Sequence, residues 1–299
     1  MVASGLLLNQ YSAALSSWTV YLLGIQMLII GLSVRISAIC QALRRPYNLL
    51  LWVAFAWVLL PFFSFLLGRT FLQTNPGFAA GLVLTTSLPA AITANIWTGL
   101  SHGNLALSLT IVGATSVLSG VVTPLLLGAW VGVFVHLDSV NLLISFLYSV
   151  LAPTLLGIGV NEAVQTRLDP YRTLLKLLLK LIVGLVIFIN AGVLHPHLAE
   201  WGWSAVNIFL LVIIQAVIIY ALLLTVLRRI PRISTSDIIA LTYTIGMRNN
   251  SAGIVIAMTY FGPVVAAPVI LSVLMQQPLA SLVHRFVLNR TRDGAAHDC

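Results

Sequence analysis

Two polar stretches interrupt apolar segments of the sequence, and they contain the side chains best suited to bind a ligand. One stretch covers residues 87–95 and contains Pro89, and the other covers residues 242–251 and contains Gly246. Proline lacks a backbone donor and glycine weakens a helix, so each stretch predicts a helix that is broken inside the bundle. Hydroxyl and amide side chains at such breaks are typical of a polar cavity in a membrane protein. The alternative is a pair of kinked helices whose polar side chains only bond neighbouring helices.

The second stretch also contains Arg248, which lies far from both ends of its apolar segment. An arginine at such a depth costs about 2.5 to 3.5 kcal/mol on insertion scales, and Arg248 has no obvious acidic partner inside a span. Its guanidinium is always charged, and its planar fork suits carboxylate, sulfonate or phosphate oxygens. The sequence therefore predicts that Arg248 binds an organic anion. The alternative is that Arg248 points into a water-filled crevice and binds backbone carbonyls.

The composition places these stretches in a membrane protein. The chain has 299 residues, of which 60% are hydrophobic and 7% are charged, whereas an average soluble domain carries roughly 25% charged residues. The mean hydropathy is +1.04, and apolar runs of about 20 residues recur along the chain, each long enough to cross a bilayer as a helix. This pattern excludes a water-soluble globule. The two cysteines, Cys40 and Cys299, form no disulfide framework and are expected to be reduced.

Apolar runs and the Pro, Gly and charged residues between them predict an all-α polytopic membrane protein with nine transmembrane helices. The predicted spans are residues 17–34, 47–68, 77–99, 104–135, 139–161, 173–194, 203–227, 236–261 and 263–288. Residues 1–16 have no basic region and no long apolar core, so they are interpreted as a short external segment rather than a signal peptide.

The basic residues predict the orientation of the spans. Thirteen of the fifteen Lys and Arg residues fall on one side of the nine-span arrangement: Arg35, Arg44, Arg45, Arg167, Arg172, Lys176, Lys180, Arg228, Arg229, Arg232, Arg285, Arg290 and Arg292. Because bases in short loops stay in the cytoplasm, the N-terminus is predicted outside and the C-terminus in the cytoplasm. Arg69 is the one base on the other side. Loops of this kind explain the net charge of +8, so no nucleic-acid partner is expected.

The two predicted breaks lie five spans apart, which inverts the second element in the membrane relative to the first. This is the layout of inverted repeats whose broken helices meet near the bilayer midplane, and it favours a transporter. An enzyme is not expected, because the sequence has no paired acids, His-Glu-x-x-His run or Gly-x-Ser-x-Gly elbow. The pair His195 and His197 lacks further metal donors nearby apart from Glu200, so we interpret residues 195–197 as an external turn and expect no metal site or cofactor.

The same residues resemble the bile acid:sodium symporter family of secondary transporters. Residues 89–95 correspond to the family pattern Pro-Gly-Gly-Thr-Ala-Ser-Asn, and residues 244–249 correspond to Glu-Val-Gly-Met-Gln-Asn. Further matches are residues 23–27, the Arg45-Pro46 turn, the Leu60-Pro61 pair, residues 103–108 and Thr123-Pro124. The resemblance covers residues from about 20 to 285 and implies a ten-helix plan, of which the first helix is expected to be missing here.

The resemblance also implies a division of the chain, which forms a single transporter unit over residues 1–299. The first repeat is expected over residues 17–135 and the second, inverted repeat over residues 139–288. Residues 17–34, 139–161 and 173–194 are expected to form a panel domain, and residues 47–135 and 203–288 a core domain that moves against it.

Family members hold two sodium ions near the crossing of the broken helices, and most of the corresponding positions are changed here. Carried over position by position, the family's side-chain ligands fall on Ala56, Ala94, Asn95, Ser108, Val112, Thr244 and Arg248. Asn95 and Ser108 keep the family's oxygen donors. Sodium is a hard cation that needs several oxygen ligands, so the loss or change of donors at five of the seven positions predicts that sodium is not required. One family Glu and two sodium ions sum to +1, and the neutral Thr244 with the charged Arg248 also sums to +1 without an ion.

The sequence thus predicts a secondary transporter that moves a small organic anion by alternating access and is not coupled to sodium. The candidate substrate-binding residues are Arg248, Thr93, Asn95, Thr244, Asn249, Asn250 and Gln276, of which Gln276 is a lesser candidate, as is Ser108. One alternative is a sodium-coupled anion symporter with one residual ion site at Asn95, Ser108 and Thr244. An alternative of another class is a membrane receptor or sensor that binds the anion without moving it.

Overall fold

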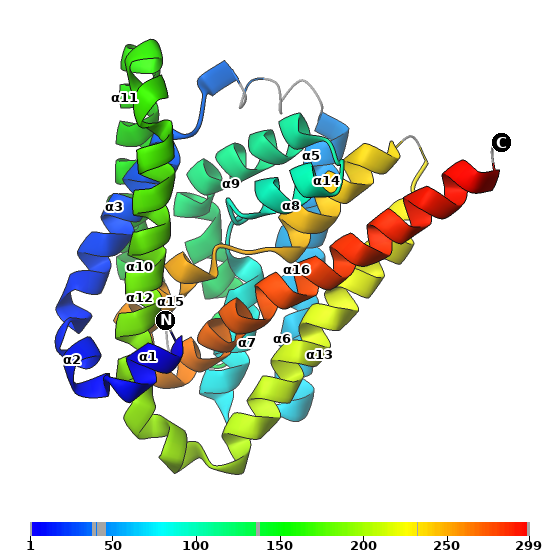
Figure 1. Cartoon of the computed structure of the whole chain (residues 1–299). Helices are drawn as coiled ribbons and strands as arrows, with labels where there is room; N and C mark the ends of the chain where they lie inside the picture. Colours follow the sequence, from blue (N-terminus) through cyan, green and yellow to red (C-terminus); the bar gives the residue numbers. More distant parts are fainter. Residues whose placement is uncertain (1, 38–39, 41–45, 136–137, 232, 298–299) are drawn as a thin grey trace.

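The computed structural model describes residues 2–37, 40, 46–135, 138–231 and 233–297, and within these ranges every regular element is a helix (Figure 1). The predicted all-α polytopic fold is confirmed. Six helical segments are long and apolar enough to cross a membrane. Four residues named in the sequence analysis lie outside the described residues: Arg44, Arg45, Arg232 and Cys299.

Each of the six long segments falls on a predicted span, and most are assembled from consecutive helices. Their elements are α5 (Pro46–Val53), η2 (Ala54–Leu59) and α6 (Leu60–Phe71); α9 (Leu105–Leu126) and η3 (Leu127–Val131); α10 (Ser139–Phe146), η4 (Leu147–Leu151) and α11 (Ala152–Leu168); η5 (Asp169–Tyr171) and α12 (Arg172–Trp201); α13 (Trp203–Val226) and η6 (Leu227–Arg229); and α16 (Pro263–His297). The segments η2, η3 and η4 are turns of π-helix inside these rods.

The other three predicted spans have a different form. The first corresponds to η1 (Ser16–Trp18) and α3 (Thr19–Leu32), which together are shorter than a full span. The third is broken into α7 (Pro76–Ser87) and α8 (Ala94–Leu100), and the eighth into α14 (Thr235–Gly246) and α15 (Asn250–Tyr260). The breaks at Pro89 and after Gly246 are therefore confirmed, whereas the count of nine membrane spans stays a prediction.

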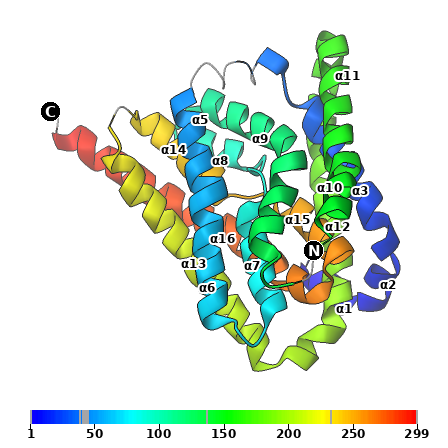
Figure 2. The ribbon, with the colours of Figure 1, turned by 180° about the vertical axis from the view of Figure 1, so that it is seen from behind.

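The helices gather on two sides of the molecule (Figures 1 and 2). Helices α3, α10, α11 and α12 form one side, and α5, α6, α13 and α14 lie on the other, while α16 begins beside α12 and runs diagonally across to α13. Helices α3 and α11 pack closely because each carries a glycine at the contact. A Cβ atom on Gly31 would lie 2.2 Å from the Thr154 carbonyl oxygen, and one on Gly157 would lie 2.2 Å from the Leu28 carbonyl oxygen. Larger side chains at these two positions would force the helices apart.

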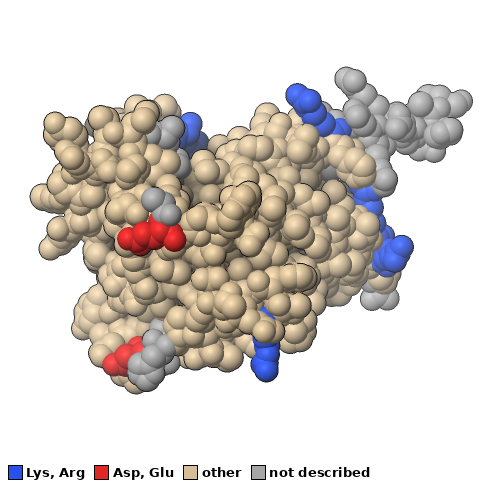
Figure 3. Space-filling view, turned by 90° about the horizontal axis from the view of Figure 1, so that it is seen from below, with Lys and Arg blue, Asp and Glu red and all other residues tan. Residues whose placement is uncertain are grey.

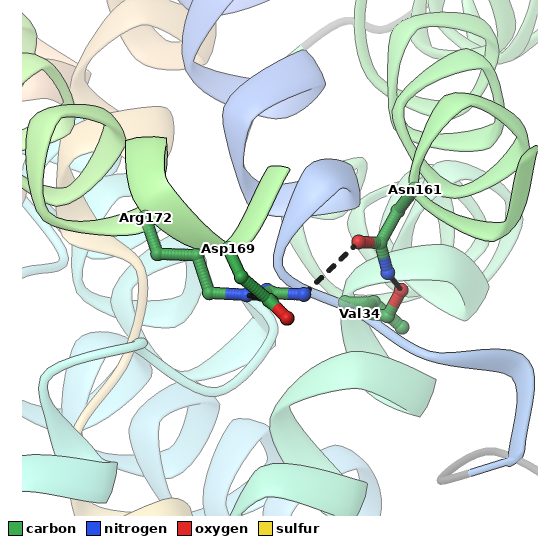
Figure 4. Close-up of polar contacts among 4 residues, drawn as sticks. All are labelled: Val34, Asn161, Asp169 and Arg172. Atoms are coloured by element: carbon green, nitrogen blue, oxygen red, sulfur yellow. Dashed lines mark hydrogen bonds and ion pairs between the residues drawn. The ribbon is translucent and has the colours of Figure 1, made fainter. Parts of the chain in front are cut away.

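Polar contacts fix the end of α3 to the turn between α11 and α12 (Figure 4). Asn161, which is buried, donates from Nδ2 to the Val34 carbonyl oxygen at 2.8 Å, and Arg172 donates to Asn161 Oδ1 at 3.4 Å. Arg172 also pairs with Asp169 at 2.6 Å. Because Asn161 is satisfied by backbone and side chain together, α3, α11 and α12 are joined at this end by polar contacts as well as by apolar packing.

The N-terminal residues form two helices, and the end of α12 differs from the sequence prediction. Residues expected as a short external segment form α1 (Val2–Leu7) and α2 (Asn9–Ala14), and both helices pack against α12. The turn expected at residues 195–197 is wrong, because α12 continues through Pro196 to Trp201. His195 instead meets Asn9 of α2, with 2.9 Å between its Nδ1 and the amide nitrogen. The packing of α2 on this face is close, since Ser12 is fully buried beside Gly192.

The outer surface is largely uncharged. Seen from below, the molecule shows few charged side chains, and uncharged residues cover most of the face (Figure 3). Large apolar side chains such as Leu50, Leu125 and Leu181 are exposed on the long helices. An exposed apolar surface of this kind is what a helix bundle presents to lipid.

Candidate functional site

The two breaks cross at the centre of the bundle and pair through their backbones. The segment between α7 and α8 meets the segment between α14 and α15 (Figure 1), and Ala90 and Arg248 form an isolated antiparallel β-bridge. The Ala91 amide donates to the Met247 carbonyl oxygen at 2.9 Å, and the Asn249 amide donates to the Pro89 carbonyl oxygen at 3.0 Å. The chain is extended at both breaks, so backbone groups that a continuous helix would satisfy internally are paired across the crossing instead.

Arg248 lies at this crossing with its side chain 4% exposed. Its guanidinium donates to the Leu88 carbonyl oxygen at 3.0 Å and to the carbonyl oxygen of Ala56, and it lies 5.2 Å from the centre of the Trp52 ring. Carbonyl oxygens and an aromatic face both stabilise a buried cation. The partners of Arg248 are therefore those of the alternative interpretation, in which it binds backbone carbonyls, although its Nε atom has no hydrogen-bond partner among the described residues.

Two further candidates lie beside Arg248. Asn250 donates from Nδ2 to Gln276 Oε1 at 2.9 Å, and the Arg248 backbone amide donates to the same oxygen at 3.3 Å. Gln276 thus ties α16 to the second break. These contacts place Arg248, Asn250 and Gln276 in one polar group, as the sequence analysis expected for a binding site.

A cavity of about 50 Å³ borders this group, between α6, α7, α13, α16 and the second break. Four of its lining residues are almost fully buried and carry a polar atom that finds no hydrogen-bond partner in the described part of the chain: Arg248, Asn250, Gln215 and Tyr220. A buried polar atom left unpaired costs about 1 to 3 kcal/mol. The cavity therefore suits polar contents such as ordered water.

A second polar group lies between α8 and α9. Ser108 is fully buried and donates to Asn95 Oδ1 at 2.7 Å, and it accepts a hydrogen bond from Thr98 at 3.3 Å. Ala94 and Val112, which the family resemblance places at the sodium site, are buried and apolar. Asn95 and Ser108 are thus brought together as expected, but they satisfy one another.

Two of the remaining candidates, Thr244 and Thr93, make no hydrogen bond to the group around Arg248 among the described residues. The Thr244 hydroxyl donates to the Ala240 carbonyl oxygen of its own helix at 2.7 Å. Thr93 stands before α8, and its buried hydroxyl has no partner within the residues that the structure describes. Neither side chain joins the group around Arg248 through a hydrogen bond that the structure displays.

Asn249 belongs to a third polar group, which reaches the opposite side of the molecule. Gln26 of α3 is 1% exposed, and its Nε2 donates to Ser251 Oγ at 2.7 Å and to Asn249 Oδ1 at 3.3 Å. Ser251 in turn donates to Asn249 Oδ1 at 2.9 Å. These contacts join α3 to the start of α15.

Three residues of these groups were missed as site residues by the sequence analysis: Gln26, Ser251 and Trp52. Gln26 and Ser251 each lie within a matched motif or polar stretch, so a polar side chain inside an apolar helix was the signal available for them. Trp52 lies in an apolar run with no local feature that predicts contact with Arg248, which is 196 positions away.

The described residues form a helical bundle with six membrane-length helices and two crossing broken helices, which is the architecture of a secondary transporter. The chain matches the model of the Sodium Bile acid symporter family over residues 20–201. It belongs to this family, which consists of transporters and not enzymes, as the sequence motifs indicated.

Relatives cover most of the chain. It is 30% identical over 268 residues to the "Uncharacterized protein YbaS" of Bacillus subtilis, a match that spans 87% of this chain and 85% of that protein. It is 27% identical to the "Uncharacterized sodium-dependent transporter YocS" of the same organism, over 85% of this chain and 78% of the relative. A third relative is the "Probable sodium/metabolite cotransporter BASS1, chloroplastic" of Arabidopsis thaliana, which is 26% identical over 89% of this chain and 66% of its own length.

Proposed function

We propose that this secondary transporter moves a small organic anion by alternating access and does so without sodium coupling. The observation that carries the proposal is the buried guanidinium of Arg248, which lies against two carbonyl oxygens at the crossing of the broken helices. A fixed positive charge in this place attracts anions and repels small cations, because charges act strongly in a medium of low dielectric constant.

The residues at the family's ligand positions do not fit a sodium ion. Ala56, Ala94 and Val112 offer no side-chain oxygen, and the Ala56 carbonyl oxygen already accepts a hydrogen bond from Arg248. Asn95 and Ser108 keep their oxygens, but these bond to one another. A hard cation needs several oxygen ligands at once. The proposal therefore departs from the relatives whose names describe sodium dependence.

Arg248 makes no ion pair with an acidic side chain among the described residues, which leaves its charge to a ligand. Asp237, at the start of α14, accepts hydrogen bonds from Asn48 at 3.2 Å and from Asn104 at 2.7 Å. In the described structure the hydrogen bonds of the guanidinium go to carbonyl oxygens, which carry no formal charge. An organic anion that enters the crossing would supply the missing negative charge. The candidate donors are the unpaired Nε of Arg248 and the side-chain amide nitrogens of Asn249 and Asn250.

A thermal-shift screen of anionic metabolites, run with and without sodium, tests the proposal. A ligand that binds the folded state raises the apparent melting temperature. We expect at least one monocarboxylate, sulfonate or phosphate ester to stabilise the protein equally in sodium and in potassium. Stabilisation that requires sodium would favour the symporter alternative. Binding without flux in sealed proteoliposomes would favour the receptor alternative.

We also propose that the N-terminus lies outside and the C-terminus in the cytoplasm. The α11–α12 turn, the α13–α14 connection and the end of α16 lie toward the same end of the molecule, opposite the α12–α13 turn (Figure 1). A cysteine introduced between Arg167 and Arg172 should react only with reagent on the cytoplasmic side, and one between His195 and Glu200 only with reagent outside. Labelling of both positions from one face would contradict this orientation.

A further inference from the structure

Gln26 connects the two sides of the molecule at the crossing. Its helix, α3, is held to α11 by the close glycine contacts at Gly31 and Gly157, and Gln26 reaches across to Asn249 and Ser251 at the start of α15. Asn249 also pairs with Pro89 through its backbone amide. The Gln26 carboxamide therefore contacts the residues that hold the two breaks together.

The hydrogen-bond directions at this contact are informative. Gln26 Nε2 donates both bonds, and the Ser251 and Asn249 side-chain oxygens accept them. The Ser251 proton is already used, since it is donated to Asn249. If α3 moved away, the buried Ser251 hydroxyl oxygen would lose its donor, whereas Asn249 Oδ1 would keep the Ser251 hydroxyl and the Ala252 amide as donors. An unpaired buried acceptor is costly.

We propose that Gln26 is a specificity-determining residue whose carboxamide competes with a hydrogen-bond donor of the substrate for the same acceptors. In this state its carboxamide occupies the acceptors of Asn249 and Ser251, and during transport a hydrogen-bond donor of the substrate replaces it. The substrate class is then an organic anion that also carries a hydroxyl or N–H group, which narrows the proposed function and rests on it. The Gln26 Oε1 atom, which is buried and has no partner in the described structure, is available to accept from the same donor group.

The first test needs no substrate and measures the contact itself. In a full-length protein with Cys40→Ser and Cys299→Ser, the reporter is Ile30→Cys, which lies one turn after Gln26 on the same face of α3 and replaces a side chain that is 3% exposed. Adding Gln26→Leu should speed labelling of this cysteine by a small maleimide about five- to tenfold, the change in an opening equilibrium expected from losing one or two buried hydrogen bonds.

Two further variants keep this test decisive. Ser251→Ala removes an acceptor and leaves Gln26 in place, so it should speed labelling in the same direction. Asn190→Leu is the matched control, because Asn190 is also a buried amide but donates within its own helix, to the Val186 carbonyl oxygen. Labelling that is unchanged in both Gln26→Leu and Ser251→Ala, or equally faster in Asn190→Leu, would overturn the proposal.

The second test measures the substrate requirement with pairs of anions that differ by one hydroxyl: lactate and propionate, glycolate and acetate, and 2-hydroxyisovalerate and isovalerate. Thermal shifts should show tighter binding of the hydroxy acid in each pair, and Gln26→Leu should tighten hydroxy-acid binding further because the competing carboxamide is gone. Equal binding within the pairs, or weaker binding in Gln26→Leu, would overturn the specificity role. Faster labelling with no binding of any acid would support the contact and count against the proposed anion transport.

Discussion

Two of the polar groups at the crossing, the one between α8 and α9 and the one around Arg248, satisfy their buried polar atoms in different ways. Between α8 and α9, Asn95 and Ser108 are neutral and satisfy one another. The guanidinium of Arg248, at the second break, is a positive charge that belongs to the chain itself, and it donates to the carbonyl oxygens of Leu88 at the first break and of Ala56 in η2. Carbonyl oxygens exposed where helices are broken favour a cation. The comparison suggests that a covalently attached cation can take the place of a mobile one.

The largest effect is expected from removing that charge. Arg248→Gln should weaken binding of the anion found by the thermal-shift screen by about 2 to 5 kcal/mol, the range for truncating one member of a buried charge pair. Arg248→Lys should restore part of the affinity, because it keeps the charge but loses the planar fork. Calorimetric or thermal-shift titration of the purified variants measures this. Wild-type affinity in the glutamine variant would leave Arg248 with a purely structural role.

Glycines on the two sides of the comparison should respond differently to a methyl group. A Cβ atom on Gly246 would lie 2.5 Å from the ring of Tyr220, whereas one on Gly99 in α8 would meet nothing within 4 Å. Gly246→Ala should therefore lower the free energy of unfolding by about 1 to 3 kcal/mol through overpacking. Gly99→Ala should be neutral or stabilising, since alanine is the better helix former. Thermal unfolding of both variants gives the comparison, and equal melting temperatures would show that the second break is less tightly packed than described.

A double substitution converts the site around Arg248 toward the sodium site of the family. Thr244→Glu combined with Arg248→Gln restores the family's residues at both positions, so uptake should become sensitive to sodium. The gain should be partial, because Ala94 and Val112 still lack donors. Uptake that stays indifferent to sodium in this variant would show that the carry-over of the family's ligand positions is incomplete.

The smallest effect is expected in the neutral group. Ser108→Ala removes the donor to Asn95 and the acceptor for Thr98, so it should cost about 1 kcal/mol in the free energy of unfolding. It should leave the response to sodium unchanged. A sodium response that is present in the wild type and lost in Ser108→Ala would place an ion site at Asn95 and Ser108. It would contradict the description of this group as one without an ion.

Local signals in the sequence were sufficient to predict the breaks. Proline and glycine with hydroxyl and amide neighbours inside apolar runs change the helix at the position where they occur, so the interruptions near Pro89 and Gly246 could be read directly. Pro196 gave a misleading signal of the same kind, because neighbouring helices can support a proline inside a membrane-length helix.

The partners of the side chains could not be predicted in the same way. The sequence left open whether Arg248 meets an anion or carbonyl oxygens, since that depends on where η2 places Ala56 and where the first break places Leu88. The contact between Gln26 and Ser251 joins residues 225 positions apart. Such contacts follow from helix packing, which hydrophobic periodicity does not specify.

The central claim is that transport is not coupled to sodium. The most direct test is to measure anion uptake into proteoliposomes in sodium and in an impermeant organic cation at fixed membrane potential. A guanidinium about 4 Å from a sodium ion would oppose it by about 4 kcal/mol at an effective dielectric constant near 20, which weakens binding roughly a thousandfold. Initial rates of anion uptake should therefore be the same in both media. A steep and saturable dependence on sodium would contradict the account.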